Sequence, residues 1–214
     1  MPQESIEFLK GENLTKVYSH KIALDHVRFE VEQGMKVGLV GPRGSGKTTL
    51  LKIIFGWCRP TTGRIVFEGR PPSRFSKSRI AYLPETDYFY DWMTVGQMIN
   101  LVSSFYPDWK KGREEKLIEL LKLDKKIRIR KLTRDHKARL KLCLTLSRSS
   151  SLVLLDEPFE VIDRDSQMKI LASITNEISL ENQTLILSTP DVLGNDSLFD
   201  RIMTLDQGRL ITGR

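Results

Sequence analysis

A glycine-rich segment, Gly41–Thr48 (Gly-Pro-Arg-Gly-Ser-Gly-Lys-Thr), constrains the fold of this chain more than any other stretch. The apolar run Lys36–Val40 precedes it and predicts a buried strand, while the spacing of apolar residues in Thr48–Phe55 predicts a helix. Strand, glycine loop and helix, in that order, are the context in which the pattern G-x-x-x-x-G-K-[ST] holds phosphate groups. The sequence therefore predicts an α/β fold built around a phosphate-binding loop.

The residue types of this loop suit phosphate chemistry. Its glycines let backbone N–H groups turn toward phosphate oxygens, and the following helix adds its positive N-terminal end. Lys47 is predicted to contact the β- and γ-phosphates, and Thr48 to ligate Mg²⁺ through its hydroxyl. A glycine turn with an incidental lysine is the alternative, which this context disfavours. The predicted nucleotide-binding residues here are Gly41, Pro42, Arg43, Gly44, Ser45, Gly46, Lys47, Thr48 and Thr49.

A second apolar run, Leu152–Leu155, ends in two adjacent carboxylates. Asp156 is predicted to hold Mg²⁺, through water, and Glu157 to polarise an attacking water as general base. Two acidic residues at a strand end also occur in plain turns, but the intact phosphate loop favours the metal site. Glu157 and Lys47 are thus the predicted catalytic residues.

Further strands surround this pair. Alternation of apolar and polar residues in Ser5–Phe8, Leu14–Val17 and Ala23–Val31 predicts an N-terminal antiparallel β subdomain. Ser151–Leu155 and Gln183–Ser188 predict buried parallel strands joined by a helix. That helix is expected over Ser166–Ile178, and Ile202–Leu205 with Arg209–Ile211 is expected to form a closing hairpin. The sheet should be mainly parallel and flanked by helices.

The stretch from Tyr88 to Leu146 is rich in Lys, Glu and Leu, and has helical periodicity in Glu114–Leu123 and Lys137–Leu146. It predicts a helical subdomain, residues 88–146, inserted into a nucleotide-binding core of residues 1–87 and 147–214. At 214 residues the whole chain is expected to be one domain that buries roughly 70% of its unfolded surface.

Composition narrows the class of protein. Hydrophobic residues make up 40% and charged residues 29%, as in an ordinary soluble protein. The apolar runs are far shorter than the about 20 residues of a membrane-spanning helix, and Met1–Ser5 lacks the features of a secretory signal. We therefore expect a cytoplasmic protein. Cys58 and Cys143 are isolated and are expected to be small core residues.

The net charge of +7 is concentrated in Lys122–Arg139. Such a run attracts polyanions, and it could lie near anionic lipid headgroups or form a solvated helical face. No recognised nucleic-acid module accompanies the charge, so we expect no nucleic-acid partner.

With Gly41–Thr49 and Leu152–Pro158 in place, the chain resembles the ATPase subunit of an ABC transporter along almost all of its length. The resemblance implies ATP and Mg²⁺ as cofactors. It also implies that Tyr18 stacks on adenine, an interaction of about 1–3 kcal/mol, although a core-filling tyrosine is an alternative. Asp163 matches an aspartate that communicates across a dimer interface, and a helix N-cap explains it equally well.

The same resemblance bears on partners. Lys47 and Asp156 are 109 residues apart, which leaves room for a small helical insertion and none for a long coiled coil. Chromosome-structure and DNA-repair relatives are therefore disfavoured. The sequence around Tyr82–Glu85 and Tyr88–Thr94 resembles the region that receives a short helix of the membrane subunit. Its aromatic side chains suit an exposed groove or, alternatively, pack under the helical insertion; they are Tyr88, Phe89, Tyr90 and Trp92.

Three family positions that sense the γ-phosphate are altered. Glu85 replaces a glutamine and is predicted to remain a Mg²⁺ ligand. The signature Leu-Ser-Gly-Gly-Gln is replaced by Leu132–His136, in which Asp135 would bring a carboxylate near phosphate. Such a pair of charges about 4 Å apart costs roughly 4 kcal/mol unless Arg134 or Mg²⁺ offsets it. Pro190 replaces a histidine and offers neither donor nor charge.

These changes predict ATP binding with slow hydrolysis, because this chemistry depends on positioning and charge stabilisation. We expect a transporter subunit that is peripheral on the inner face of the cell membrane through a membrane-spanning partner, as a homodimer or paired with a second ATPase. A nucleotide-sensing structural or regulatory subunit is the alternative. A soluble P-loop kinase is disfavoured because it leaves Tyr18 and the helical insertion unexplained. The transported substrate and the direction of transport lie in the membrane partner.

Overall fold

The computed structural model describes residues 8–176, 183–191 and 196–213. In chain order, its elements are β1 (Leu9–Tyr18), β2 (Lys21–Val31), β3 (Lys36–Val40), α1 (Lys47–Phe55), β4 (Thr62–Phe67), α2 (Arg74–Arg79), β5 (Ile80–Leu83), α3 (Val95–Ser103), α4 (Lys111–Leu120), η1 (Ile129–Lys131), α5 (Arg134–Leu146), β6 (Leu152–Asp156), α6 (Arg164–Asn176), β7 (Thr184–Thr189), η2 (Asp196–Leu198), β8 (Arg201–Asp206) and β9 (Arg209–Gly213).

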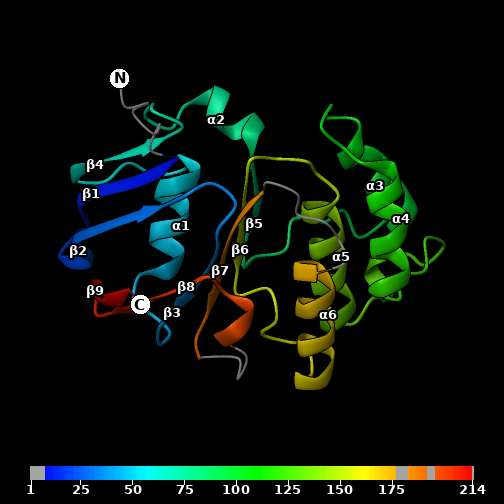
Figure 1. Ribbon diagram of the computed structural model, residues 1–214. Coiled ribbons are helices and arrows are strands. Elements are labelled where there is room, and N and C mark those ends of the chain that lie inside the picture. The colour runs from blue at the N-terminus through cyan, green and yellow to red at the C-terminus, as the bar shows by residue number, and fades with distance from the viewer. Residues whose placement is uncertain (1–7, 177–182, 192–195, 214) are drawn as a thin grey trace.

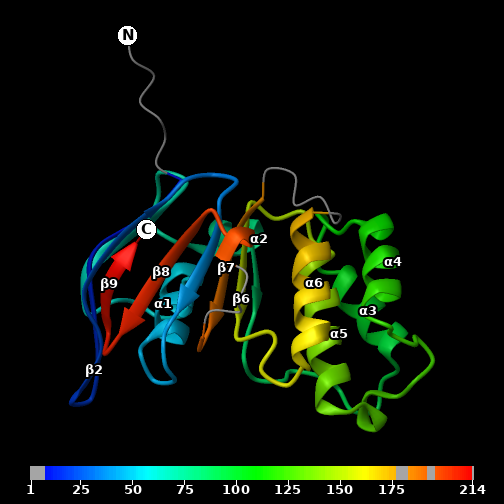
Figure 2. The same ribbon diagram turned by 60° about the horizontal axis from the view of Figure 1, so that its bottom comes forward.

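Two β-sheets lie on either side of α1 (Figure 1). The antiparallel sheet has the strand order β2-β1-β4, and the larger sheet has the order β5-β6-β7-β3-β8-β9. All pairs of the larger sheet are parallel except β8 with β9. Helices α3 to α6 lie together on the side of this sheet away from α1 (Figure 2). The expected α/β class, with an N-terminal antiparallel sheet and a mainly parallel one, is confirmed.

The parallel strands are buried because each of their two faces packs against a different core. In β6, Leu152 and Leu154 contribute to the core around α1, whereas Val153 and Leu155 contribute to the core under α5 and α6. Continuous apolar runs without alternation are what such double burial requires. The predicted strands 36–40, 151–155 and 183–188 and the hairpin are confirmed, to within one or two residues at their ends.

The antiparallel sheet differs from the sequence expectation at its edge. The predicted strands 14–17 and 23–31 are confirmed as parts of β1 and β2. The predicted strand Ser5–Phe8 falls mostly outside the described residues, and Phe8 is a bend before β1. The pairing of β4 with β1, which begins at Leu9 opposite Phe67, was not predicted. This sheet covers α1 and positions Tyr18 at the end of β1.

Helices α3, α4 and α5 follow one another between β5 and β6, as expected of an inserted helical region, while the boundaries 88 and 146 stay a prediction. The helix expected over Ser166–Ile178 is α6, and the part of that prediction beyond Asn176 lies outside the described residues. The expectation of a helical face in the basic stretch is wrong for 122–133, which consists of turns and the short η1. None of the described helices is both long enough and apolar enough to cross a bilayer.

Candidate nucleotide-binding site

The glycine loop between β3 and α1 has a backbone that only small residues allow. Gly46, the N-cap of α1, has φ of 110°, in the region that favours glycine. A Cβ atom on Gly41 would lie 2.0 Å from the carbonyl oxygen of Leu205. Any residue larger than glycine is therefore disfavoured at these two positions, and the loop backbone lies against Leu205 of β8.

Lys47 is buried at the base of this loop, with 3% of its surface exposed. Its Nζ donates to the carbonyl oxygens of Gly41, at 2.6 Å, and Pro42, at 3.0 Å. It also lies 3.1 Å from Oε1 of Glu157. The ammonium is thus held where the loop closes, and the two predicted catalytic side chains are in contact.

The loop also leaves hydrogen-bonding groups for an anion. No described side chain caps the N-terminus of α1. The first backbone N–H groups of the helix are therefore available as hydrogen-bond donors, and the positive end of the helix dipole faces the loop. The hydroxyl of Ser45 is buried and has no hydrogen-bond partner among the described residues. A phosphate group in the loop would satisfy these donors, so the residues present fit a nucleotide.

Asp156 ends β6 and is fully buried. Its Oδ1 accepts hydrogen bonds from Thr48 Oγ1, at 3.1 Å, and Ser188 Oγ, at 3.0 Å. Its Oδ2 accepts one from Tyr82 Oη, at 3.0 Å. The hydroxyl and the carboxylate predicted as Mg²⁺ ligands therefore lie side by side, although they are far apart in the sequence. A hydroxyl and a carboxylate beside phosphate oxygens form the donor set that Mg²⁺ prefers.

Burial raises the pKa of the Asp156 carboxyl, and the three hydrogen bonds oppose that shift. The charge of Glu157 next to it adds to the increase. Burial also raises the pKa of Tyr82, with the Asp156 carboxylate as the next cause, so the phenol stays a donor. A buried carboxylate that has no cationic partner among the described residues is suited to binding a metal cation.

The sequence placed Tyr82 only in the predicted docking region for the membrane subunit, and it predicted no contact of Tyr82 or Ser188 with Asp156. They lie near the carboxyl ends of β5 and β7, the two strands that flank β6, and Ser188 is directly opposite Asp156 in the register. Ser188 Oγ also accepts a hydrogen bond from the backbone N–H of Glu157, at 2.9 Å. A polar side chain at the end of each neighbouring strand was the signal that could have found them.

Glu157 has φ of 45°, in the left-handed region that disfavours a side chain with a Cβ. Its side chain is 8% exposed and points to Lys47. Further along, Glu160 forms an ion pair with Arg43 of the loop. The segment after β6 thus contacts the glycine loop through two acidic residues.

Tyr18 is 45% exposed, so the alternative of a core-filling tyrosine is wrong. Its hydroxyl lies 3.5 Å from the sulfur of Cys58, and Lys16 Nζ lies 4.9 Å from its ring centroid. Cys58 itself is half-buried and not a core residue, whereas Cys143 is fully buried. Burial raises the pKa of the Cys143 thiol to about 12, which agrees with a packing role.

Two of the altered positions lie on the surface. The side chain of Glu85 is exposed, and its carbonyl oxygen accepts a hydrogen bond from Lys141 Nζ, at 2.7 Å. Pro190 follows β7 and is exposed. Neither side chain forms a hydrogen bond or ion pair with Thr48 or Asp156 in the described part of the chain, so the metal role of Glu85 stays a prediction.

The altered signature segment begins α5. Thr133 caps this helix, because its hydroxyl accepts from His136 N at 3.3 Å. Asp135 Oδ2 accepts from Arg139 Nε at 2.8 Å, while Asp135 Oδ1 is buried without a hydrogen-bond partner among the described residues. The cation that offsets Asp135 is therefore Arg139, one turn along, and not the exposed Arg134.

Asp163 caps α6. Its Oδ1 accepts a hydrogen bond from Ser166 N, at 2.9 Å, and these bonds to Ser166 lower the pKa of its carboxyl. The N-cap explanation is therefore confirmed, and a role across a dimer interface stays a prediction.

An aromatic pocket of about 370 Å³ opens between β5 and the helices α3 and α5. The side chains of Phe55, Trp57 and Tyr82 form a cluster with ring centroids 4.8 to 5.2 Å apart, and Tyr82 joins this pocket to Asp156. Tyr88 also lines it and is 42% exposed. The alternative that these aromatic side chains pack under the helical insertion is wrong for Tyr90 and Trp92, which are exposed. Tyr88 is partly exposed, but burial raises the pKa of its hydroxyl, and Phe89 packs partly against the helical core.

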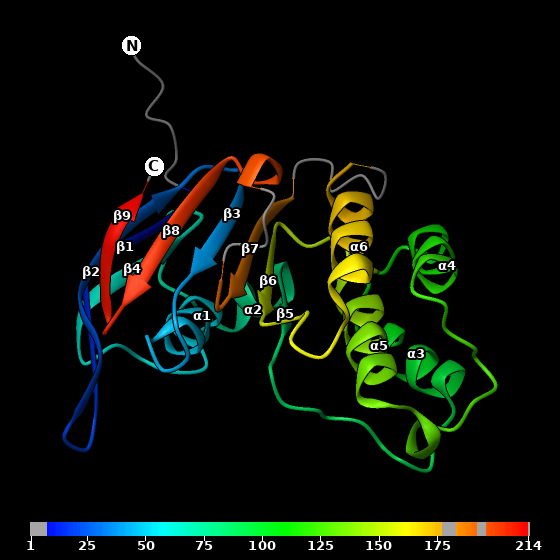
Figure 3. The ribbon, with the colours of Figure 1, turned by 90° about the horizontal axis from the view of Figure 1, so that it is seen from below.

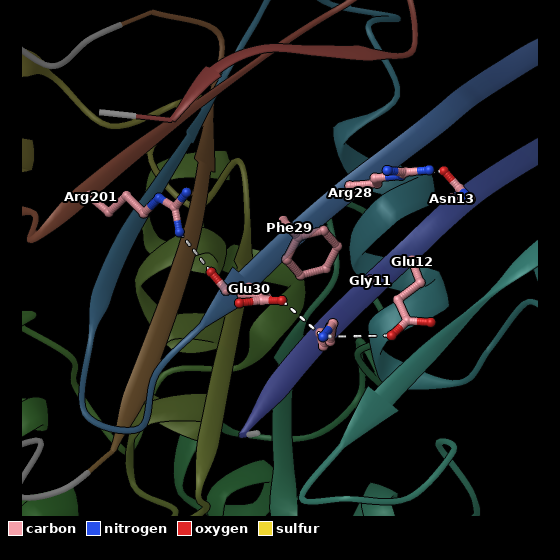
Figure 4. A pocket seen from close by; sticks show the side chains of 8 residues that line it. Gly11, Glu12, Asn13, Arg28, Phe29, Glu30 and Arg201 are labelled. Carbon is pink, nitrogen blue, oxygen red and sulfur yellow. Dashed lines mark hydrogen bonds and ion pairs between the residues drawn. The ribbon is translucent and has the colours of Figure 1, made fainter. Parts of the chain in front are cut away.

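A separate pocket lies on the antiparallel sheet and contains none of the predicted site residues (Figure 4). Its charged groups satisfy one another: Lys10 Nζ lies 3.0 Å from Glu30 Oε1, and Arg201 donates to the Glu30 carbonyl oxygen at 2.8 Å. This pocket is not part of the nucleotide site.

The comparisons with known proteins agree with this geometry. The chain is 29% identical to an ABC transporter ATP-binding protein of Synechocystis over 88% of its own length, and spans 55% of that relative. A solved putative ABC transporter ATP-binding protein from Pyrococcus furiosus is 31% identical, with a TM-score of 0.80, and 92% and 96% of the two chains are covered. An ATP-binding cassette solved as a dimer with ADP and phosphate shares the fold, with 20% identity, a TM-score of 0.84 and coverage of 97% and 98%. Residues 24–160 match the family described as ABC transporter. The chain belongs to the ABC transporter family, as an ATP-binding subunit.

Proposed function

We propose that this ATP-binding subunit holds Mg-ATP in the loop Gly41–Thr49, hydrolyses it slowly and transmits nucleotide binding to a separate membrane-spanning subunit. The observation that carries the proposal is the convergence of Thr48 and Asp156, whose oxygen atoms lie 3.1 Å apart beside Lys47. Residues from α1, β6 and β7 meet around this carboxylate, which is buried and hydrogen-bonded but forms no ion pair among the described residues.

The chain's own groups have separate tasks in this site. Loop amides, the Ser45 hydroxyl and Lys47 neutralise the triphosphate, and the Lys47 ammonium exchanges its carbonyl partners for phosphate oxygens. Thr48 and Asp156 would hold Mg²⁺, which supplies charge neutralisation at the β- and γ-phosphates. Glu157 is freed from Lys47 in that exchange and is then placed to accept a proton from water. Tyr18 offers its exposed ring to adenine.

We attribute slow turnover to the Asp135 carboxylate in the altered signature segment and to Pro190. In a closed dimer, Thr133 and the start of α5 of one subunit would face the γ-phosphate bound by the other, together with the Asp135 carboxylate. Arg139 reduces but does not remove the resulting repulsion, because only one carboxylate oxygen is paired. Pro190 gives neither a hydrogen-bond donor nor a charge to the attacking water. Ground-state binding is affected less than the transition state.

Partners follow from the same features. The fold shared with a cassette that was solved as a dimer supports dimerisation, and a second, different ATPase would supply the signature and histidine groups that this chain has altered. The aromatic pocket beside Tyr88 is suited to a short amphipathic helix of the membrane subunit. With such a partner the chain would be peripheral on the inner face of the cell membrane.

Calorimetry and phosphate release test the proposal on the purified chain. We expect Mg-ATP to bind with a dissociation constant well below millimolar and phosphate release to be slow. No uptake of Mg-ATP or Mg-ADP at millimolar concentration would overturn the nucleotide-binding assignment. The regulatory alternative predicts no acceleration of turnover when the membrane subunit is added, whereas a transporter subunit predicts acceleration.

A further inference from the structure

One surface of the helical region gathers positive charge that the nucleotide site does not use. We call it the basic loop, and it contains five exposed cations without an ion pair in the part of the chain that the structure describes: Lys122, Lys126, Arg128, Arg130 and Lys131. Of the other charged residues nearby, Lys125 pairs with Glu114 at 3.0 Å and Lys137 with Asp91 at 3.5 Å. Asp124 accepts a hydrogen bond from the backbone N–H of Lys126 but forms no ion pair among the described residues.

The basic loop is fixed next to exposed aromatic side chains. Ile129 N donates to Met93 O at 2.9 Å, and Arg130 N donates to Asp91 O at 3.2 Å, so residues 91–93 run alongside 129–130. Figure 3 shows the segment after β5 reaching this loop near the start of α5. Trp92 is 66% exposed and Tyr90 is 53% exposed, with ring centroids 6.0 Å apart. Cations and amphipathic rings therefore share one surface.

We propose that the basic loop, together with Tyr90 and Trp92, is a binding surface for the anionic headgroups of a lipid bilayer. Clustered Lys and Arg side chains are attracted to anionic lipid, each by roughly fivefold in affinity. Trp and Tyr prefer the bilayer interface because their rings are apolar and their N–H or O–H groups are wet. Nucleic acid also binds surfaces that combine cations with aromatic side chains, but the sequence contains no recognised nucleic-acid-binding module, which favours lipid.

This surface acts independently of nucleotide chemistry. Its cations lie outside the glycine loop and do not contact Asp156 or Glu157 in the described part of the chain. Direct contact with lipid would orient the subunit beneath the membrane and raise its local concentration for the membrane partner. The inference is therefore separable from the proposed function, and each can fail alone.

The test is sedimentation of the full chain with vesicles at low salt. We expect binding to vesicles of phosphatidylcholine mixed with phosphatidylglycerol, weak binding to pure phosphatidylcholine, and release at high salt. The variant Arg128→Gln/Arg130→Gln should bind roughly 30-fold more weakly, from two fivefold factors. The matched control Lys21→Gln/Lys169→Gln removes two exposed cations elsewhere and should bind like the parent chain.

A second readout reports on the aromatic part of the surface. Tryptophan emission should shift to the blue on binding to the anionic vesicles, and Trp92→Phe should lose that shift. Calorimetry with Mg-ATP should be unchanged in all four chains, which separates this inference from the nucleotide site. Equal binding by the Arg128→Gln/Arg130→Gln variant and the control would overturn the proposal. So would tighter binding to single-stranded RNA than to anionic vesicles, an outcome that would assign the loop to nucleic acid.

Discussion

The two sides of the predicted catalytic site differ in how well they are built. On the side of the glycine loop, Thr48 donates a hydrogen bond to Asp156, and the buried Lys47 donates to the carbonyl oxygen of Gly41 and pairs with Glu157. At the altered positions, Asp135 at the start of α5 carries a buried oxygen without a hydrogen-bond partner among the described residues, and Pro190, which follows β7 beside the glycine loop, offers no side-chain donor. Binding a nucleotide needs the first side alone, whereas fast hydrolysis needs both. This difference is the basis of our proposal that the chain holds ATP better than it hydrolyses it.

The largest effect is expected for Lys47→Ala. Loss of two charge-assisted hydrogen bonds to phosphate should weaken Mg-ATP binding on the order of a thousandfold. Calorimetry measures this, with Lys52→Ala in the last turn of α1 as a control of equal charge change. A melting curve shows whether Glu157, left without its cation, destabilises the fold. Unchanged binding in a folded Lys47→Ala chain would contradict the role assigned to the loop.

A smaller effect is expected for Tyr82→Phe, which removes only the hydroxyl that donates to Asp156. Groups that orient a metal ligand typically contribute 10- to 100-fold to metal affinity. We expect a decrease of about that size in Mn²⁺ affinity of the nucleotide-bound chain, measured by electron paramagnetic resonance. Tyr88→Phe lines the same aromatic pocket without bonding Asp156 and should leave the affinity unchanged.

On the altered side, Asp135→Asn should accelerate ATP hydrolysis by about tenfold. The substitution removes a negative charge that we propose lies close to the γ-phosphate, and the ion pair with Arg139 already reduces the repulsion from that charge. Phosphate release under saturating Mg-ATP measures it, and Glu119→Gln serves as a control at an exposed acidic residue of α4. If turnover falls or does not change, Asp135 is not what limits hydrolysis.

The smallest expected effect is on the thermal stability of the metal-free chain and on how that stability depends on pH. Because burial raises the pKa of Asp156 in the folded state, this group favours folding below its unfolded pKa and loses that contribution as the pH rises through the folded pKa. Asp156→Asn should therefore melt a few degrees higher than the parent chain at neutral pH, and the difference should vanish in acid. Calorimetric melting at several pH values checks this, and a difference that grows in acid would reverse the assignment.

Much of the fold could be predicted because the signals are local. The apolar runs of β3, β6 and β7 and the turn between β8 and β9 are complete within a few residues. In contrast, β4 and β5 were not predicted. β5 has only four residues, and β4 acquires its strand pairing from β1, about 50 residues away. Their conformation depends on partners that the local pattern does not contain.

The site divides in the same way. The roles of Lys47, Thr48 and Asp156 follow from motifs that are contiguous in the sequence. Tyr82 and Ser188 meet Asp156 only because the strand order is β5-β6-β7, which no local pattern encodes. Arg139 was missed because the cation that offsets Asp135 was sought at the neighbouring Arg134, and not one helical turn further along α5.

The most direct test compares affinity with turnover for Mg-ATP on the purified chain under one set of conditions. Enzymes commonly turn over about 10 times per second, and loss of one transition-state contact costs about 100- to 1,000-fold. We therefore predict tight binding together with turnover below about 0.1 per second. Turnover of about 10 per second by this chain alone would contradict the account.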